Sequence, residues 1–245
     1  MQGTSSSAET VSLSLDRARV YRALAQLFRM PDAQSIWEAR DRNLPELCAA
    51  LDRLEPASTL AGMARDLCEL FEAAELDRLR AGYETAFDES SAARCAPTEM
   101  DQLDGPPQLE LTRTFEMADV AGFYKAFGVE VEADGERADH IAAELEFMNL
   151  LAVKESIALQ EEGEGEHAQI CRDASRSFLR DHLMRWAPRL GELLAAEEHD
   201  PIYRIVGRLL GGFVTFDAEK VEADRAPLHR VDPTLHSTAP HSEPR

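Results

Sequence analysis

Apolar residues recur every three or four positions along almost the whole chain, and this spacing is the feature that most restricts the fold. The segment 58–75, STLAGMARDLCELFEAAE, is strongly amphipathic and has Ser58 in a position to cap it, and 14–28 repeats the pattern after Ser14. No segment alternates convincingly as a β-strand does, and no unit repeats at a fixed period. We therefore expect an all-α protein, a single helical bundle domain of about nine or ten helices. The predicted helices cover residues 14–28, 33–42, 45–54, 58–75, 76–87, 110–127, 137–161, 167–187, 189–199 and 200–221.

Three segments lack this period and divide the chain. Residues 88–108 are rich in Pro, Gly, Ser and Asp, which predicts one long loop inside the domain. Residues 1–13 and the Pro- and His-rich residues 222–245 are expected to be disordered, which leaves 14–221 as the folded domain. The long loop also offers a hinge, so we expect either a monomer or a domain-swapped dimer.

Composition narrows the classes of partner and the compartment. The net charge of −20 argues against nucleic acid, whose phosphates require a basic surface, and favours basic partners. No apolar run approaches the length of a membrane span, and the N-terminal residues lack the pattern of a secretory signal. We therefore expect a cytoplasmic localisation. The four cysteines form no Cys-x-x-Cys pair and are expected to be buried thiols.

The segment ADHIAAELEFMNLLAVKE, residues 138–155, places polar groups among its apolar ones. At 100° per residue, His140 and Glu144 fall inside the arc of apolar side chains and lie one turn apart. Two interpretations stay open: a buried pair that satisfies itself by hydrogen bonding, or the polar floor of a binding groove. Asp139 is expected in the first turn of this helix, on its polar side, where the helix dipole favours a carboxylate.

A metal site is the competing interpretation of the same segment. Di-metal sites in helical bundles use Glu-x-x-His from two helices and single glutamates from two others. This chain has Glu136 and His140 but no such motif near them, so we expect neither a metal nor another cofactor. A metal-dependent helical-bundle enzyme that uses His140, Glu136 and Glu144 is kept as the alternative. The chain has no nucleophile or nucleotide-binding motif, and no enzymatic activity is expected.

Five motifs follow one another along the chain: YETAF (83–87), CAPTEM (95–100), FYKAFGVEV (123–131), ERADHIAAELEFMNLL (136–151) and FLRDHLMRW (178–186). Together and in this order they resemble the TorD/DmsD/NarJ family of redox-enzyme maturation chaperones over about residues 17–220, with Ala138 where the family often has Pro.

The resemblance implies a cytoplasmic, all-helical chaperone that is not an enzyme. Its partner would be the catalytic subunit of a molybdopterin oxidoreductase, bound through its twin-arginine signal peptide or as apoprotein. The chaperone would assist cofactor insertion and delay export until the subunit is mature. The matching positions for peptide or client binding are Tyr83, Phe87, Pro97, Glu99, Glu136, Asp139, His140 and Glu144.

Overall fold

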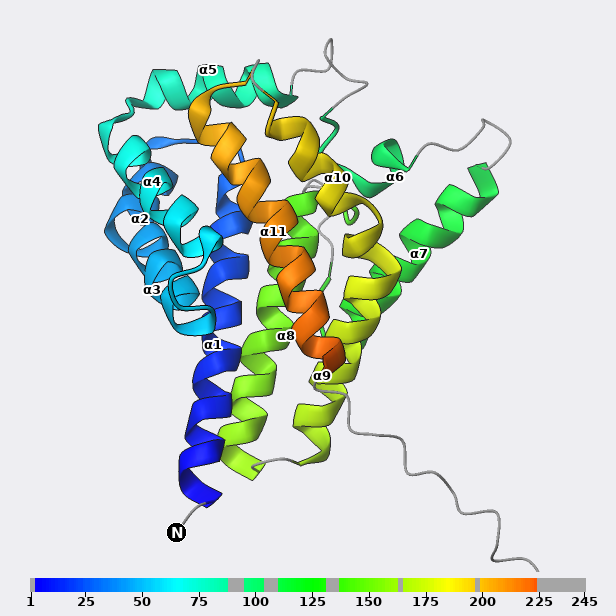
Figure 1. The fold of residues 1–245 in the computed structure, drawn as a ribbon. Coiled ribbons are helices and arrows are strands. Elements are labelled where there is room, and N and C mark those ends of the chain that lie inside the picture. The colour runs from blue at the N-terminus through cyan, green and yellow to red at the C-terminus, as the bar shows by residue number, and fades with distance from the viewer. Residues whose placement is uncertain are drawn as a thin grey trace, which may run out of the picture.

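The computed structural model is built from helices that pack around one extended core, as Figure 1 shows. It describes residues 3–87, 95–103, 110–130, 137–162, 165–196 and 199–223. Within these ranges no strand is present beyond one isolated bridge, so the prediction of an all-α bundle is confirmed. None of the described helices combines the length and apolarity needed to cross a membrane.

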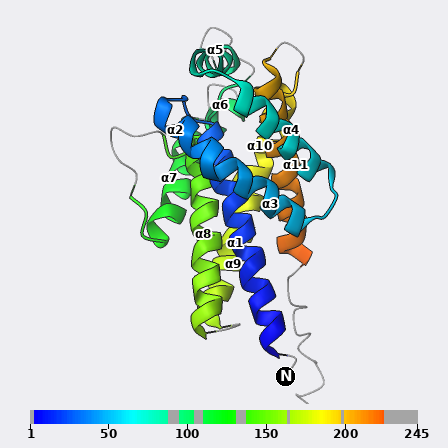
Figure 2. The ribbon, with the colours of Figure 1, turned by 90° about the vertical axis from the view of Figure 1, so that its left-hand side faces the viewer.

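Two long helices form the axis of the molecule. Helix α1 (Gly3–Leu27) and helix α8 (Ile141–Glu162) lie side by side along the bundle in both Figure 1 and Figure 2. The six apolar residues that the helical arc of 138–155 predicted to face the core are all buried: Ile141, Leu145, Phe147, Met148, Leu151 and Ala152.

The other helices pack around this axis on several sides. The first group consists of α2 (Ala33–Glu38), the π-helical turn η1 (Ala39–Asn43), α3 (Leu44–Leu54) and α4 (Thr59–Ala73), and α5 (Leu76–Phe87) lies across one end of the bundle (Figure 1). The predicted cap of α4 is confirmed, because the Ser58 hydroxyl accepts a hydrogen bond from the Ala61 amide at 3.1 Å.

The second group carries the groups described below as the candidate site. It contains α6 (Glu99–Gln102), α7 (Glu110–Ala126), α9 (Glu166–Phe178), the π-helical turn η4 (Leu179–Leu183), α10 (Met184–Leu194) and α11 (Pro201–Ala223). Gly128 follows α7 with φ of +79°, the left-handed conformation that a glycine after a helix adopts readily. Helices α10 and α11 cross so closely that a Cβ on Gly191 would lie 2.5 Å from the Gly207 carbonyl oxygen.

Some of the predicted boundaries are wrong. Residues 3–13 were expected to be disordered, but they form the first turns of α1, and Val11 packs against Ala158 and Leu159 of α8. Pro188 was expected to end a helix, but α10 continues through it to Leu194. Buried Trp186, Ala187 and Leu190 hold this helix against its neighbours, and that packing offsets the hydrogen bond that proline does not donate.

The loop predicted at 88–108 is only partly visible. Residues 88–94 and 104–108 lie outside the described residues, while 95–103 contains the short helix α6. The tail predicted from 222 begins with two residues that still belong to α11, and the remainder lies outside the described residues.

Candidate functional site

The segment 95–103 is held against the residues that precede α8. The Glu99 amide donates to the Asp139 carbonyl at 2.8 Å, and the Ile141 amide donates to the Pro97 carbonyl at 2.8 Å. Thr98 and His140 form the isolated antiparallel bridge between them. Four of the predicted site residues, Pro97, Glu99, Asp139 and His140, are therefore neighbours, although some forty positions of sequence separate the two segments.

Asp139 is the side chain that links these two segments. Its carboxylate receives two hydrogen bonds from the Arg137 guanidinium, at 2.9 and 2.8 Å, and one from the Met100 amide at 3.2 Å. The residue is fully buried and precedes α8. The prediction that Asp139 lies in the first helical turn on the polar side is therefore wrong. The helix starts at Ile141, four residues later than the predicted start at 137, because the backbone of 139–141 is paired with 97–99 instead.

His140 and Glu144 do not occupy equivalent surroundings. His140 is half-buried, its carbonyl accepts the Glu144 amide at 3.0 Å, and its Nδ1 accepts a hydrogen bond from the Ala142 amide at 3.2 Å. Glu144 is fully buried, and its Oε2 accepts a hydrogen bond from the Trp186 indole at 3.2 Å. The Glu144 carboxyl thus finds a hydrogen-bond partner on α10.

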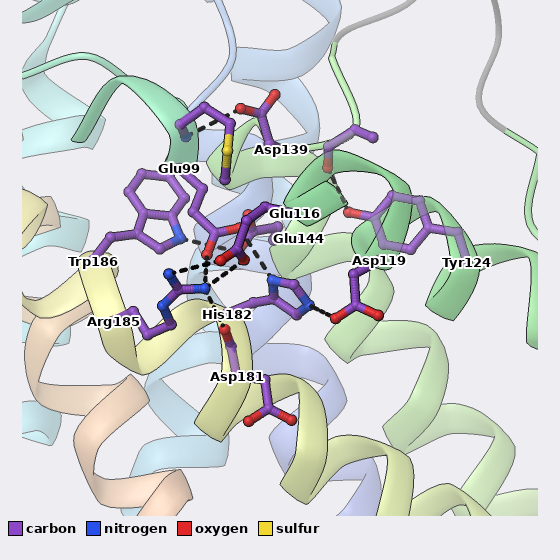
Figure 3. Close-up of polar contacts among 12 residues, drawn as sticks. Glu99, Glu116, Asp119, Tyr124, Asp139, Glu144, Asp181, His182, Arg185 and Trp186 are labelled. Carbon is purple, nitrogen blue, oxygen red and sulfur yellow. Dashed lines mark hydrogen bonds and ion pairs between the residues drawn. The ribbon is translucent and has the colours of Figure 1, made fainter. Parts of the chain in front are cut away.

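Glu144 belongs to a group that we call the acidic cluster. Figure 3 shows its carboxyl groups gathered beside the His182 ring and the Arg185 guanidinium. The cluster is contributed by α6, α7, α8, η4 and α10 and consists of Glu99, Glu116, Asp119, Glu144, His182 and Arg185.

His182 connects the buried and exposed sides of the cluster. Its Nδ1 lies 3.1 Å from Glu99 Oε2, and its Nε2 lies 3.3 Å from Asp119 Oδ2. Glu99 and His182 are both fully buried, whereas the Asp119 side chain is 63% exposed. The His182 ring also packs against Phe178, with ring centroids 4.9 Å apart. The contact between His182 and Glu99 was not anticipated from the sequence.

Arg185 is the cation of the cluster. It binds Glu116 in bidentate fashion, at 2.6 and 3.1 Å, and its Nη1 lies 3.6 Å from Glu99 Oε1. The contact with Glu116 raises the pKa of Arg185 above its ordinary value, so the guanidinium stays charged. Carboxyl groups still outnumber basic ones in the cluster, because Glu99, Glu116, Asp119 and Glu144 face one guanidinium and one imidazole.

Three buried polar atoms of the cluster make no hydrogen bond within the described part of the chain. Among the described residues, Glu99 Oε1, Glu144 Oε1 and His182 Nε2 are buried and accept or donate no hydrogen bond. Burial, and then the nearby charge of Glu99, raise the pKa of Glu144 well above its ordinary value, which favours the neutral carboxylic acid. Buried acceptors without a hydrogen bond cost free energy, so their presence calls for an explanation, and a functional role at a binding site is one of those available.

The cluster also contains the set of side chains best placed to hold a metal ion. One ligand atom from each of Glu99, Glu116 and His182 lies within 4.8 Å of the others. This set shares no residue with the His140, Glu136 and Glu144 set of the alternative interpretation. Glu136 lies outside the described residues. The guanidinium of Arg185 already supplies a positive charge between Glu99 and Glu116.

Tyr83 and Phe87 belong to a second region, at the end of the bundle that α5 covers. Their rings are 4.8 Å apart, and Phe87 packs edge-on against Phe28 and Tyr203 at 5.9 and 6.0 Å. They line an open cleft of about 540 Å³. The other residues of this aromatic cleft are Met30, Ala81, Glu84 and Thr85.

Sequence reasoning missed Glu116, Asp119 and Arg185. Each belongs to an amphipathic helix in which an exposed charge is ordinary, and no motif distinguishes them from other surface charges. His182 did have a signal, because it stands four residues before Trp186 on a face that is otherwise apolar. A histidine at such a position needs a polar partner, and the spacing does not say which helix supplies it.

Comparisons with known proteins find assembly chaperones. The model of the family described as nitrate reductase delta subunit matches residues 44–192. The selenate reductase assembly chaperone protein of Thauera selenatis is 29% identical over 216 residues, which cover 88% of this chain and 91% of that protein. The perchlorate reductase assembly chaperone protein of Dechloromonas aromatica is 32% identical over 190 residues, which cover 74% of this chain and 78% of that protein.

A third relative carries the name of the TorD group. The chaperone protein TorD of Vibrio cholerae is 26% identical over 209 residues, which cover 82% of this chain and 81% of that protein. The three relatives are named as chaperones and not as catalysts, in agreement with the prediction of a protein without enzymatic activity.

Proposed function

This chain belongs to the nitrate reductase delta subunit family, as its resemblance to the TorD/DmsD/NarJ chaperones predicted, and on that basis we propose that it is a cytoplasmic assembly chaperone for a molybdopterin oxidoreductase. It binds the twin-arginine signal peptide or the apoprotein of the catalytic subunit, assists cofactor insertion and delays export until the subunit is mature. The observation that carries the proposal is the similarity, over most of both chains, to proteins named as selenate and perchlorate reductase assembly chaperones.

The acidic cluster has the chemistry that binding of arginine requires. Carboxylates bind guanidinium groups in bidentate geometry, and Glu116 already binds Arg185 in this way. Asp119 is mostly exposed, and the Arg185 side chain is 36% exposed, so the outer side of the cluster is open to solvent. An arginine from a client pairs with Asp119 or takes the place of Arg185 at Glu116 and Glu99.

The aromatic cleft supplies the apolar half of such a site. A signal peptide places an apolar stretch after its arginines, and extended apolar segments bind in grooves lined by aromatic and aliphatic side chains. Met30, Tyr83 and Phe87 line the cleft beside α5. In this proposal the cleft accommodates the apolar stretch, and the acidic cluster together with the Asp139 segment receives the charged end.

Net charge adds attraction at longer range. A chain with charge −20 attracts a basic peptide before contact, and this attraction is screened beyond about 8–10 Å at 0.1–0.15 M ionic strength. The affinity for a twin-arginine peptide should therefore fall as salt is raised, while the apolar contacts retain part of it. An affinity that is independent of salt would contradict the electrostatic part of the proposal.

The decisive experiment measures binding of a fluorescent twin-arginine peptide by anisotropy. The same peptide with both arginines replaced by glutamine serves as the ligand control. We expect Glu99→Gln to weaken binding of the twin-arginine peptide about tenfold, which corresponds to about 1.4 kcal/mol, because one carboxylate of the cluster is lost. Glu192→Gln is the matched protein control, since it removes a carboxylate that is 70% exposed on the same helix as Arg185.

Three results would count against the proposal. Equal affinity of the wild-type protein for the two peptides contradicts arginine recognition. Equal affinity of the Glu99→Gln and Glu192→Gln proteins, with both melting like wild type, removes the acidic cluster from the site. If the protein binds neither the twin-arginine peptide nor the apoprotein of a molybdopterin catalytic subunit, the chaperone function itself is overturned.

A further inference from the structure

Two of the four cysteines lie next to each other on neighbouring helices. Cys48 of α3 and Cys68 of α4 are 20 positions apart in sequence, and their Sγ atoms are 3.0 Å apart. Both are free thiols and both are half-buried, so they remain within reach of small molecules. The sequence predicted four buried thiols, which is correct for Cys95 and Cys171 but wrong for this pair. Packing of α3 against α4 brings together two cysteines that no sequence motif links.

From this juxtaposition we propose that Cys48 and Cys68 form a reversible redox site, which a small disulfide such as oxidised glutathione converts into an intramolecular disulfide. The sulfur atoms need to approach by only about 1 Å to reach the disulfide bond length of about 2.05 Å. The bond would join α3 to α4 and leave the acidic cluster untouched. The inference is independent of the proposed chaperone function.

The two thiols have different surroundings, and this difference indicates which of them attacks first. A hydrogen bond between them lowers the pKa of Cys48 and raises the pKa of Cys68. Arg65 lowers the pKa of Cys48 further, although burial and Asp52 oppose it. Cys68 Sγ also lies 3.6 Å from the Leu44 carbonyl, which accepts a hydrogen bond from a thiol but not from a thiolate. Cys48 is therefore the nucleophile and Cys68 the resolving thiol.

The reaction proceeds in two exchanges. The Cys48 thiolate attacks one sulfur of oxidised glutathione, forming a mixed disulfide and releasing one glutathione thiolate. Cys68 then loses its proton and attacks the Cys48 sulfur, which breaks the mixed disulfide and releases the second glutathione thiolate. The two protein thiols are oxidised by two electrons, and the two glutathione thiolates formed take up the two protons.

The test combines alkylation and mass spectrometry on the full-length reduced protein. After treatment with oxidised glutathione and denaturation in the presence of an alkylating reagent, we expect two of the four cysteines to escape alkylation, and a linked peptide to contain Cys48 and Cys68. Because the bond closes a loop in the unfolded chain, the oxidised protein should melt higher by about 3 °C or more. Cys171→Ser, which removes a buried thiol outside the pair, should form the same bond.

The single variants test the order of attack. Cys68→Ser should accumulate a glutathione adduct on Cys48, because the resolving thiol is absent, whereas Cys48→Ser should react at least tenfold more slowly. Melting curves of both reduced variants establish that they fold. Retention of all four thiols by the wild-type protein, or a disulfide that involves Cys95 or Cys171, would overturn the proposal. Equal rates for the two single variants would overturn the assignment of Cys48 as nucleophile.

Discussion

The bundle contains two buried clusters of charged side chains, and they differ in how their charges balance. In the first, Arg17 of α1 binds Asp217 of α11 through two hydrogen bonds, at 2.6 and 3.1 Å, and Glu155 of α8 at 3.0 Å. Tyr21 donates a further hydrogen bond to Asp217, and Arg172 lies 3.3 Å from Glu155. In this Arg17 network two guanidinium groups face two carboxylates.

The acidic cluster is built from similar side chains but is not balanced. Burial alone would lower the pKa of Arg17, yet the charges of Asp217 and Glu155 outweigh it and keep that guanidinium ionised. In the acidic cluster burial instead raises the pKa of Glu144, and Glu99 Oε1 and Glu144 Oε1 have no hydrogen-bond partner among the described residues. The balanced Arg17 network is typical of a structural crosslink. The acidic cluster is typical of a binding site, because it has carboxyl oxygens that a ligand can still use as hydrogen-bond acceptors.

The largest expected effect comes from breaking the balanced network. Arg17→Ala leaves Asp217 and Glu155 buried without their main cation, and we expect a loss of about 3–5 kcal/mol in the free energy of unfolding, measured by urea denaturation. Arg65→Ala breaks a surface pair with Asp52 in which both side chains are about half exposed, and should cost less than about 1 kcal/mol. A similar loss in the two variants would refute the structural role of the Arg17 network.

A smaller effect is expected at the junction between segment 95–103 and α8. Asp139→Ala removes the acceptor for Arg137 and for the buried Met100 amide, and should lower the free energy of unfolding by about 1–3 kcal/mol. Asp52→Ala, which removes an exposed carboxylate, is the control. Because the Asp139 carboxylate also holds the Met100 amide, directly after Glu99, peptide affinity should fall in Asp139→Ala but not in the control. Unchanged stability would show that the backbone pairing of the two segments holds segment 95–103 in place without the carboxylate.

The third expected effect is a change in how stability depends on pH. Glu144 has a folded-state pKa above its ordinary value of about 4.5, so the folded protein binds a proton that the unfolded chain has lost. The stability that this bound proton contributes is fully present below pH 4.5, and it is lost as the pH rises from there toward the folded-state pKa of Glu144. Glu144→Gln has no proton to lose, and wild-type stability should decline relative to this variant by up to about 1.4 kcal/mol per pH unit above pH 4.5.

The matching substitution in the Arg17 network is Asp217→Asn, and it shows how the pH dependence of stability differs between the two clusters. Asp217→Asn removes a charge on which the buried Arg17 depends, so it should destabilise the protein throughout this pH range. Both variants are measured by thermal melts between pH 5 and 8. Parallel wild-type and Glu144→Gln curves would mean that Glu144 is ionised in the folded state.

Much of the architecture was determined by local sequence. Apolar spacing predicted most of the helices, since each must bury one face, and Ser58 marked the start of α4, which the structure confirms. The disorder predicted for residues 3–13 was wrong because their helix is stabilised by Ala158 and Leu159, which are remote in sequence. The spacing of apolar residues indicates which way a side chain points along a helix. It does not indicate which distant residues the side chain packs against.

The candidate site depended more on tertiary structure. The sequence by itself identified the 95–99 and 136–144 segments and indicated that Glu144 faces the core, because residue type and helical angle suffice for that. Only the fold joined Glu99 to His182, across 83 positions, and Glu144 to Trp186, across 42. Only the fold buried Asp139, by pairing its backbone with residues 97–99, so that α8 begins after it at Ile141. A buried charge is set by whatever side chains and dipoles surround it in space, and in this protein those come from five separate elements of the chain.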